Sequence, residues 1–381
     1  MKFLYFLIAA CAAATAGAQT AAPAPLPPIP TPTIEARAYL LLDVNSGQVL
    51  ASRNAGDKFE PASLTKLMTA YLVFGALKQK SLKPEQVVPV STRAWKAEGS
   101  RMFIEPKKPV TVDELLRGMI IQSGNDASIA LAEVIGGSEE AFAEMMNREA
   151  KRLGLANTNF TNATGLTSPQ LHSTAEDLAK LVVALIRDYP EHYPLYSQKE
   201  YRYNNITQAN RNRLLWLDPA VDGVKTGYTE NAGYCLVTSA KRGERRLVSV
   251  VLGTVSESAR AAESQKLLNW GFQAYDSVRL YARNQPVAQL RVWKGAEDML
   301  KAGFTEGLHV ALPRGQADRL KASVESLQPL LAPVHPGQRV ATLKLEIDGK
   351  PYRELPVVAL ETVPVAGVFG RAWDTLRLLF K

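Results

Sequence analysis

The sequence predicts an α/β (α+β) domain with a mainly antiparallel sheet flanked by helices, then a small all-β domain and a C-terminal amphipathic helix. Two hairpin patterns enclose a helical region. The first, AYLLLDVNSGQVLASR, turns at residues 45–47, and the second runs from AGYCLVTSA through KRGE into RRLVSVVLGTV. Because hairpins join adjacent antiparallel strands, they predict an antiparallel sheet within residues 34–275.

The N-terminal residues predict export. Lys2 precedes an apolar run over residues 3–14, and Ala-Gly-Ala at 16–18 is a cleavage pattern, so residues 1–18 are interpreted as a signal peptide. Residues 19–33, QTAAPAPLPPIPTPT, are interpreted as an extended Pro-rich tether. An alternative is lipid attachment at Cys11, for which the apolar run would be very short. Both interpretations take the protein out of the cytoplasm, and we expect it in the periplasm.

Helices are predicted between the two hairpins. PASLTKLMTA begins a buried helix, and the capping-box spacing of Thr111 and Glu114 begins another. QSGNDA interrupts the helical pattern at residues 122–127, and a third apolar helix follows it. VDGVKTGY enters a strand before the second hairpin, and ESQKLLNWGFQAY is expected to close the domain as a helix.

Residues 276–364 have a different pattern of apolar and polar residues. Short alternating runs such as QLRVWKG, LHVALPRG and RVATLKLEIDGKPY are separated by turn residues, which is typical of an all-β domain. These runs contain no catalytic constellation, so we expect the chemistry to lie within residues 34–275.

Residues 365–381, VAGVFGRAWDTLRLLFK, predict an amphipathic helix. Its polar residues lie away from the apolar face, which favours a helix lying in a membrane interface. Docking of this helix on its own domain is the alternative, and the segment is too short to span a bilayer. The apolar face comprises Phe369, Ala372, Trp373, Leu376, Leu379 and Phe380, and the residues away from it are Arg371, Asp374, Thr375 and Lys381.

Composition excludes several classes of protein. The net charge of +8 is modest for 381 residues and includes no long block of Lys or Arg, so nucleic acid is not expected as a partner. After loss of Cys11 only Cys235 remains, which excludes an intramolecular disulfide and a cysteine-based metal site. The absence of H-E-x-x-H disfavours a metalloprotease, and we expect no metal or cofactor.

Ser63 and Lys66 raise a question about the PASLTK helix. Their i, i+3 spacing puts both side chains on one helix face, within mutual reach. In a lone S-x-x-K, a helix cap and a solvated charge is the commoner explanation. Alternatively, Ser63 is a nucleophile and Lys66 its base, which requires burial or a second cation to lower the pKa of the lysine.

Two further segments favour the catalytic interpretation. Ser123 and Asn125 form S-x-N at the break between two apolar helices, and Lys225-Thr226-Gly227 form K-T-G at a strand. The order S-x-x-K, S-x-N, K-T-G matches the signature of active-site serine acyl-transfer enzymes, which include penicillin-binding proteins and β-lactamases.

The chain resembles the D-alanyl-D-alanine carboxypeptidases of the low-molecular-mass penicillin-binding type. PASLTKLMTA, QSGNDA, NRNRLLW and VDGVKTGYTENAGY resemble segments of that family, as do the β-rich second domain and the amphipathic tail. The resemblance covers nearly the whole mature chain. It implies a serine peptidase that removes the terminal D-alanine from peptidoglycan pentapeptide stems, limits the donors for cross-linking, and is acylated by β-lactam antibiotics. It also implies attachment to the outer face of the inner membrane through the C-terminal helix.

The resemblance implies a role for each motif residue. Ser63 is the expected nucleophile and Lys66 its general base. Ser123 is expected to relay a proton to the leaving amine, and Asn125 to hold the substrate amide and orient Lys66. Lys225 is expected to lower the pKa of Lys66 as its main neighbouring charge.

The substrate carboxylate is assigned to other residues by the same resemblance. Lys225, Thr226 and Arg211, in NRNRLLW, are expected to bind it. Gly227 lets a ligand approach the strand closely. The oxyanion hole is expected to use the backbone N–H groups of Ser63 and Tyr228. Many family members have His directly after K-T-G, so Tyr228 is a departure that bears on substrate preference or deacylation.

Three alternative functions have less support in the sequence. A class A β-lactamase needs Glu-x-x-x-Asn in the loop before K-T-G, and the first acid after NTNFTNATGLTSPQLHS is Glu176, at a predicted helix start. A catalytically inactive envelope-binding protein is disfavoured by the complete motif set. A Ser-His-Asp hydrolase is disfavoured because none of the four His lies in a nucleophile-elbow context and G-x-S-x-G is absent.

Overall fold

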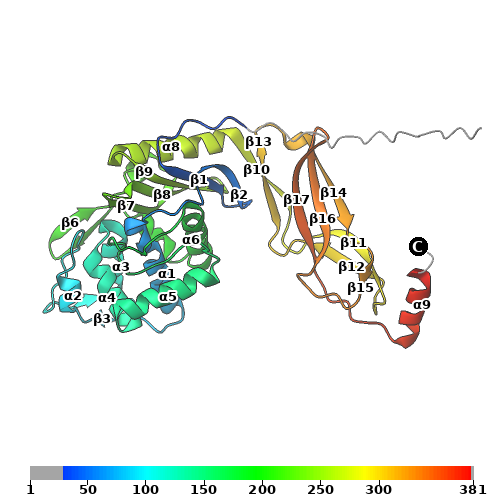
Figure 1. The fold of residues 1–381 in the computed structure, drawn as a ribbon, viewed down its shortest axis with the longest axis horizontal. Coiled ribbons are helices and arrows are strands. Elements are labelled where there is room, and N and C mark those ends of the chain that lie inside the picture. Colours follow the sequence, from blue (N-terminus) through cyan, green and yellow to red (C-terminus); the bar gives the residue numbers. More distant parts are fainter. Residues whose placement is uncertain (1–28, 379–381) are drawn as a thin grey trace, which may run out of the picture. The chain divides into compact units, whose positions relative to one another are not determined.

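The computed structural model describes residues 29–378, which form two compact units (Figure 1). One unit contains residues 29–285 and 304–317, and the other contains 286–303 and 318–378. The predicted signal peptide, the tether up to residue 28, and residues 379–381 lie outside the described residues. The chain passes between the units at three points, so the single predicted domain boundary at 275/276 stays a prediction.

A five-stranded antiparallel sheet organises the first unit. Both predicted hairpins are present, and the predicted antiparallel character is confirmed. The first strand pairs with a strand that begins about two hundred residues later, since Ala38 lies opposite Leu252. The strand order is β2 (Gln48–Arg53), β1 (Ala38–Asp43), β9 (Arg245–Thr254), β8 (Gly233–Arg242) and β7 (Val221–Thr229).

Helices cover both faces of this sheet. The 18-residue helix α8 (Glu257–Ala274) packs on one face, and the other helices gather on the opposite face (Figure 1). Trp270 and Lys266 of α8 donate hydrogen bonds to the carbonyls of Pro30 and Thr33, so the described end of the tether runs along this helix. The opposite face carries η1 (Ala62–Thr65), α1 (Lys66–Lys78), α3 (Val112–Arg117), the π-helical turn η2 (Gly118–Gln122), α4 (Asn125–Gly136), α5 (Glu139–Arg152) and α6 (Ala175–Asp188).

Short elements complete this unit. The remaining helices are α2 (Thr92–Trp95), η3 (Tyr193–Ser197) and α7 (Leu214–Leu217), and the small ribbons pair β3 (Val87–Val88) with β4 (Val110–Thr111), β5 (Glu200–Tyr203) with β6 (Ile206–Ala209), and β10 (Tyr275–Tyr281) with β13 (Leu308–Pro313).

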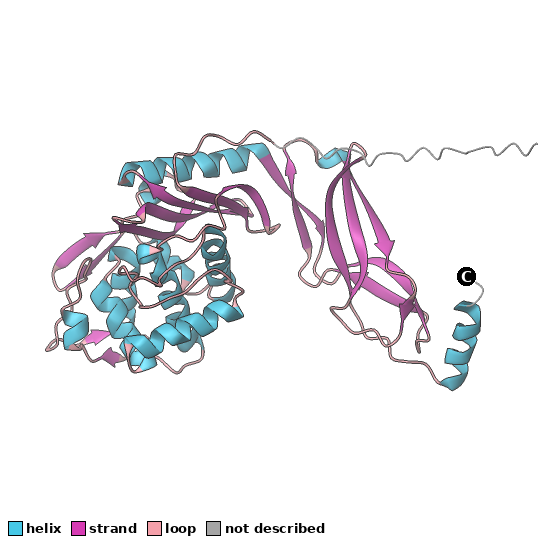
Figure 2. Cartoon of the chain, viewed as in Figure 1, coloured by secondary structure: helices cyan, strands magenta, loops and turns pink. Residues whose placement is uncertain are grey.

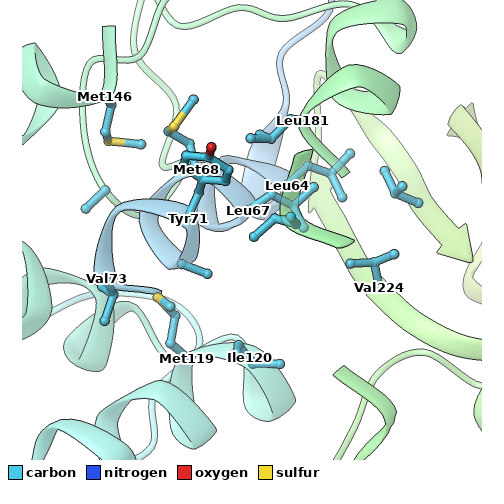
Figure 3. Packing of buried hydrophobic residues seen from close by; sticks show 14 of the residues in the cluster. Leu64, Leu67, Met68, Tyr71, Val73, Met119, Ile120, Met146, Leu181 and Val224 are labelled. Carbon is cyan, nitrogen blue, oxygen red and sulfur yellow. The ribbon is translucent and has the colours of Figure 1, made fainter. Parts of the chain in front are cut away.

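Helix α1 lies in the centre of the core. Leu67, Met68 and Tyr71 of α1, together with Leu64 of the preceding η1, pack among apolar side chains of η2, α5, α6 and β7 (Figure 3). Burying each such side chain stabilises the fold by about 1.5–3 kcal/mol. Because the first turns of this helix are buried, the polar groups on them, Lys66 included, are also held away from water.

The helix boundaries follow the predicted caps. The Thr111 side chain accepts the N–H of Glu114, and the Glu114 carboxylate accepts the N–H of Thr111, so the capping box before α3 is present. Thr174 caps α6 in the same way through the N–H of Asp177. The helical run ends in η2. Ser123, the residue that follows η2, has a left-handed conformation.

The second unit is built on a six-stranded sheet (Figure 2). All of its strand pairs are antiparallel except that of β15 with β11. The predicted all-β character is confirmed. The strand order is β14 (Leu320–Ser326), β16 (Arg339–Ile347), β17 (Lys350–Ala359), β12 (Met299–Gly303), β11 (Pro286–Trp293) and β15 (Leu330–Leu331), with the short helix η4 (Ala317–Arg319) before β14.

Helix α9 (Val368–Leu378) follows the second sheet and presents its apolar side to solvent. Phe369 is 93% exposed and Trp373 is 60% exposed. On the polar side, the buried Asp374 accepts the backbone N–H of Lys294 at 2.6 Å. None of the helices within residues 29–378 combines the length and apolarity needed to cross a membrane.

Candidate active site

The three predicted motifs meet at one pocket of about 460 Å³ in the first unit. Ser63 comes from η1, Ser123 and Asn125 from the junction of η2 and α4, and the K-T-G segment from β7. Lys66 and Lys225 do not line the pocket but lie buried behind it. The sequence-predicted residues that line it are Ser63, Ser123, Asn125, Arg211, Thr226, Gly227 and Tyr228.

Lys66 is 1% exposed and is held by three acceptors. Its Nζ lies 3.0 Å from Ser63 Oγ, 2.7 Å from Asn125 Oδ1 and 2.6 Å from the carbonyl oxygen of Thr164. Burial lowers the pKa of Lys66 to about 7, and the positive charge of Arg211 contributes next. A large fraction of this lysine is therefore unprotonated near neutral pH, within hydrogen-bond reach of Ser63.

Our prediction of the main cause of this low pKa was wrong. We expected Lys225 to lower the pKa of Lys66, but burial and Arg211 are the principal causes. Lys225 is itself buried, and its own pKa falls well below the ordinary value through burial, then through the charges of Lys66, Arg211 and Arg260. Its Nζ donates to the carbonyl of Thr226 at 3.1 Å.

Ser123 and Asn125 occupy a turn with fixed geometry. Ser123 has φ 68° and ψ 34°, which turns the chain from η2 into α4. Within residues 29–378 its buried hydroxyl has no hydrogen-bond partner, so it is free to contact a ligand in the pocket. The Asn125 amide donates to the carbonyl of Glu98 at 2.6 Å, which directs its oxygen to Lys66.

Asp126 fixes the neighbouring wall of the pocket. Its carboxylate accepts the backbone N–H groups of Met102, Phe103 and Ile104 at 3.0, 2.8 and 3.2 Å. This segment continues from Gly99 and Ser100, which line the pocket. Sequence reasoning missed this wall, although an acid directly after S-x-N was visible in QSGNDA.

Strand β7 forms another wall of the pocket. Thr226, Gly227 and Tyr228 line the pocket, and the half-exposed Tyr228 ring lies 4.4 Å from the ring of Tyr234. A Cβ on Gly227 would lie 3.1 Å from the carbonyl oxygen of Pro61. Gly227 therefore lets the strand pack closely on η1, a reason that sequence reasoning did not foresee.

Two arginines line the pocket. Arg211, predicted from NRNRLLW, donates to Ser100 Oγ at 2.8 Å. The buried Arg260 lies on α8, 3.4 Å from the carbonyl of Gly227 and 3.0 Å from a carboxylate oxygen of Glu257. With Lys225 nearby, these groups make the pocket attractive to a carboxylate. Arg260 was missed because its segment has an ordinary helical pattern with no motif.

Thr164 and Gly165 were also missed, although both line the pocket. Gly165 has φ +84°, and a Cβ there would lie 1.7 Å from the carbonyl oxygen of Ala62. The preceding Ala163 N–H donates to the buried Glu139 carboxylate at 3.0 Å. The polar loop that holds these residues was visible, but not the part of the fold it contacts.

Comparisons with known proteins agree with this geometry. The family model for D-alanyl-D-alanine carboxypeptidases matches residues 22–256. The chain belongs to the D-alanyl-D-alanine carboxypeptidase family. In keeping with this membership, the model for the C-terminal domain of penicillin-binding protein 5 matches residues 275–365.

Relatives in the carboxypeptidase family extend over almost the whole chain. D-alanyl-D-alanine carboxypeptidase DacC of Escherichia coli is 45% identical over 355 residues, which cover 91% of this chain and 89% of the relative. Penicillin-binding protein 5 of Haemophilus influenzae is 38% identical with a TM-score of 0.84, over 88% of this chain and 99% of that structure. A penicillin-binding protein of Listeria monocytogenes, solved in an ampicillin-bound form, is 31% identical with a TM-score of 0.59, over 64% of this chain and all of that structure.

The predicted family and fold class are therefore confirmed, and the β-lactamase alternative is not favoured. Glu176, the first acid after the polar loop, lies in the first turn of α6 and is not among the residues that line this pocket. Within the described part of the chain, no group of three His, Cys, Asp or Glu residues is arranged to hold a metal ion.

Proposed function

We propose that the protein is a serine D-Ala-D-Ala carboxypeptidase that removes the terminal D-alanine from peptidoglycan pentapeptide stems. The observation that carries this proposal is the buried Lys66, with a pKa of about 7 and its Nζ 3.0 Å from Ser63 Oγ. A serine hydroxyl becomes an effective nucleophile when an unprotonated base lies within hydrogen-bond reach.

Acylation starts from this pair. Lys66 takes the proton of Ser63 as Oγ attacks the carbonyl carbon between the two D-alanines. The backbone N–H groups of Ser63 and Tyr228 stabilise the oxyanion, in the manner of other acyl-transfer enzymes. Ser123 passes a proton to the leaving amine, and the unpartnered state of its buried hydroxyl among residues 29–378 supports this relay. Water then hydrolyses the acyl-enzyme.

The terminal carboxylate of the substrate is bound at the cationic end of the pocket. Arg211 and Thr226 are its proposed direct partners, and the buried Lys225 of β7 is proposed to add to the attraction when it is protonated. Gly227 permits close approach of the substrate backbone to the strand. Asn125 is proposed to hold the substrate amide and to orient Lys66, for which its 2.7 Å hydrogen bond gives support.

β-Lactam antibiotics are proposed as covalent inhibitors of the same serine. Their amide carbonyl is attacked as the peptide carbonyl is, and the ring opens without losing the leaving group. The related Listeria monocytogenes protein in its ampicillin-bound form supports this proposal.

We also propose where the enzyme works. Export by residues 1–18, followed by a tether at 19–33, would place domains 34–275 and 276–364 in the periplasm. Residues 365–381 would hold the protein on the outer face of the inner membrane. The exposed Phe369 and Trp373, on a helix whose Asp374 binds the second unit, support this attachment. There the enzyme would remove the terminal D-alanine from pentapeptide stems, which limits the donors for cross-linking. In this way it would influence cell-wall biogenesis and cell shape.

Labelling with a fluorescent penicillin, followed by peptide mapping, tests the mechanism. We expect one label, on Ser63, and release of D-alanine from a D-Ala-D-Ala peptide by the same preparation. Ser63→Ala should abolish both. A label on any other residue would overturn the assignment, and penicillin turnover without D-alanine release would favour the β-lactamase.

A further inference from the structure

A second pocket, also of about 460 Å³, adjoins the active site along one continuous stretch of chain. Gly99 and Ser100 line the active site, whereas Arg101 and Phe103 line the second pocket. Consecutive Cα atoms are about 3.8 Å apart. The two pockets therefore lie along one stretch of chain, from Gly99 to Phe103.

The second pocket is lined by exposed aromatic side chains. Trp95 is 43% exposed and Phe103 is 39% exposed, although side chains of this size are usually buried. Ile104 and Pro106 add further apolar surface to the lining. Apolar, aromatic linings with a few polar groups are typical of ligand sites.

Phe103 is held in this position at a conformational cost. Its φ of 70° lies in the left-handed region, which is a genuine outlier for a bulky residue. The Asp126 carboxylate maintains this conformation by accepting the N–H of Phe103 and those of both its neighbours. Strain that the surrounding structure maintains is concentrated at functional sites.

The pocket also carries positive charge. The Arg101 guanidinium lies 5.3 Å from the centre of the Phe103 ring, and Lys107 completes the lining. Glu105 is engaged by Lys108 at 2.8 Å and by Asn204 at 3.0 Å. Within residues 29–378, neither Arg101 nor Lys107 forms an ion pair. A ligand for this pocket should therefore combine apolar groups with a carboxylate.

We propose that this pocket binds the acidic part of the stem peptide, on the N-terminal side of D-Ala-D-Ala. This inference rests on the proposed function. An extended peptide spans about 3.3–3.6 Å per residue, so the two or three residues that precede the dipeptide reach about 7–11 Å from it. Besides its terminal carboxylate, a stem peptide with a γ-linked glutamyl residue carries a second free carboxylate in that part. Arg101 and Lys107 can pair with this second carboxylate while Trp95 and Phe103 pack on apolar groups of the peptide.

Two substrates and a matched control test the proposal. The long substrate is L-alanyl-γ-D-glutamyl-L-lysyl-D-alanyl-D-alanine, and the short one is diacetyl-L-lysyl-D-alanyl-D-alanine, which lacks the acidic residue. For Lys107→Glu and for Trp95→Ala, we expect the kcat/KM of the long substrate divided by that of the short one to fall about two- to fivefold, the scale of an exposed contact. Lys151→Glu, an exposed lysine on α5, should keep the wild-type ratio. Labelling by fluorescent penicillin checks that each variant retains a folded active site.

Two outcomes would overturn the inference. One is an unchanged ratio in both pocket variants. The other is a loss seen only when the pentapeptide carries its disaccharide, which would assign the pocket to the glycan. Failure of the proposed function is distinct, because the wild-type enzyme would then release D-alanine from neither peptide.

Discussion

Lys66 can act as a base because its side chain is buried, which lowers its pKa to about 7. An arginine at this position would keep the length and the charge but could not lose its proton. We expect Lys66→Arg to slow acylation by about a hundredfold to ten-thousandfold, the contribution of a general base. The rate of labelling by fluorescent penicillin measures this effect. Lys78→Arg, on the exposed end of the same helix, is the control and should label at the wild-type rate.

Arg211 gives the site a predictable pH dependence. Acylation needs unprotonated Lys66, so its rate should rise with pH through about 7. The charge of Arg211 lowers the pKa of Lys66, so Arg211→Gln should raise that pKa and move the rising limb to higher pH. The measurement is the midpoint of the pH profile for penicillin acylation. A lower rate with an unchanged midpoint would restrict Arg211 to carboxylate binding.

The residues of the site differ in how far the sequence could reveal them. The order of the three motifs was enough to predict that Ser63, Lys66, Asn125 and Lys225 belong to one site. Arg260 could not be found this way, because only the packing of α8 against the sheet carries it to Gly227. The cause of the low pKa of Lys66 was likewise hidden, since burial is a property of the fold.

At the scale of elements, the loop that carries Thr164 supports η1 through a close contact between Gly165 and Ala62. We expect Gly165→Ala to destabilise the fold by about 1–3 kcal/mol and to slow acylation, because the added Cβ collides with the Ala62 carbonyl. Thermal unfolding and penicillin labelling measure the two effects. Gly154→Ala is the matched control, since Gly154 has φ +71° and a Cβ added there would have nothing within 4 Å. Equal losses in both variants would show that conformational strain, and not the contact, is responsible.

Local elements were predictable, and distant pairings were not. Hairpins and the Thr111–Glu114 capping box depend on neighbouring residues, so the sequence indicated them directly. The pairing of β1 with β9 and the parallel pairing of β15 with β11 depend on where distant segments meet. The π-helical turn η2 had only the break at QSGNDA as a signal.

For the whole molecule, we expect the C-terminal helix to decide where the enzyme is found. We expect deletion of residues 365–381 to release an active enzyme into the soluble fraction, because the exposed apolar face of α9 is removed while the active site is untouched. Fractionation of cells, combined with penicillin labelling, measures both properties. The double variant Phe369→Ser and Trp373→Ser should be released in the same way. Continued membrane retention of both variants would contradict the anchor.

The pairing of β1 with β9 also has a consequence for the order of events during biogenesis. Strand β7, which carries Lys225, is bound to β8, β8 to β9, and β9 to β1. Contacts between such distant segments form slowly, because long loops must close first. A chain that emerges from its N-terminus exposes Ser63 almost two hundred residues before residue 252, the partner of Ala38. We therefore expect the site that joins Ser63 and Lys225 to assemble only after strand β9, the partner of β1, has been made.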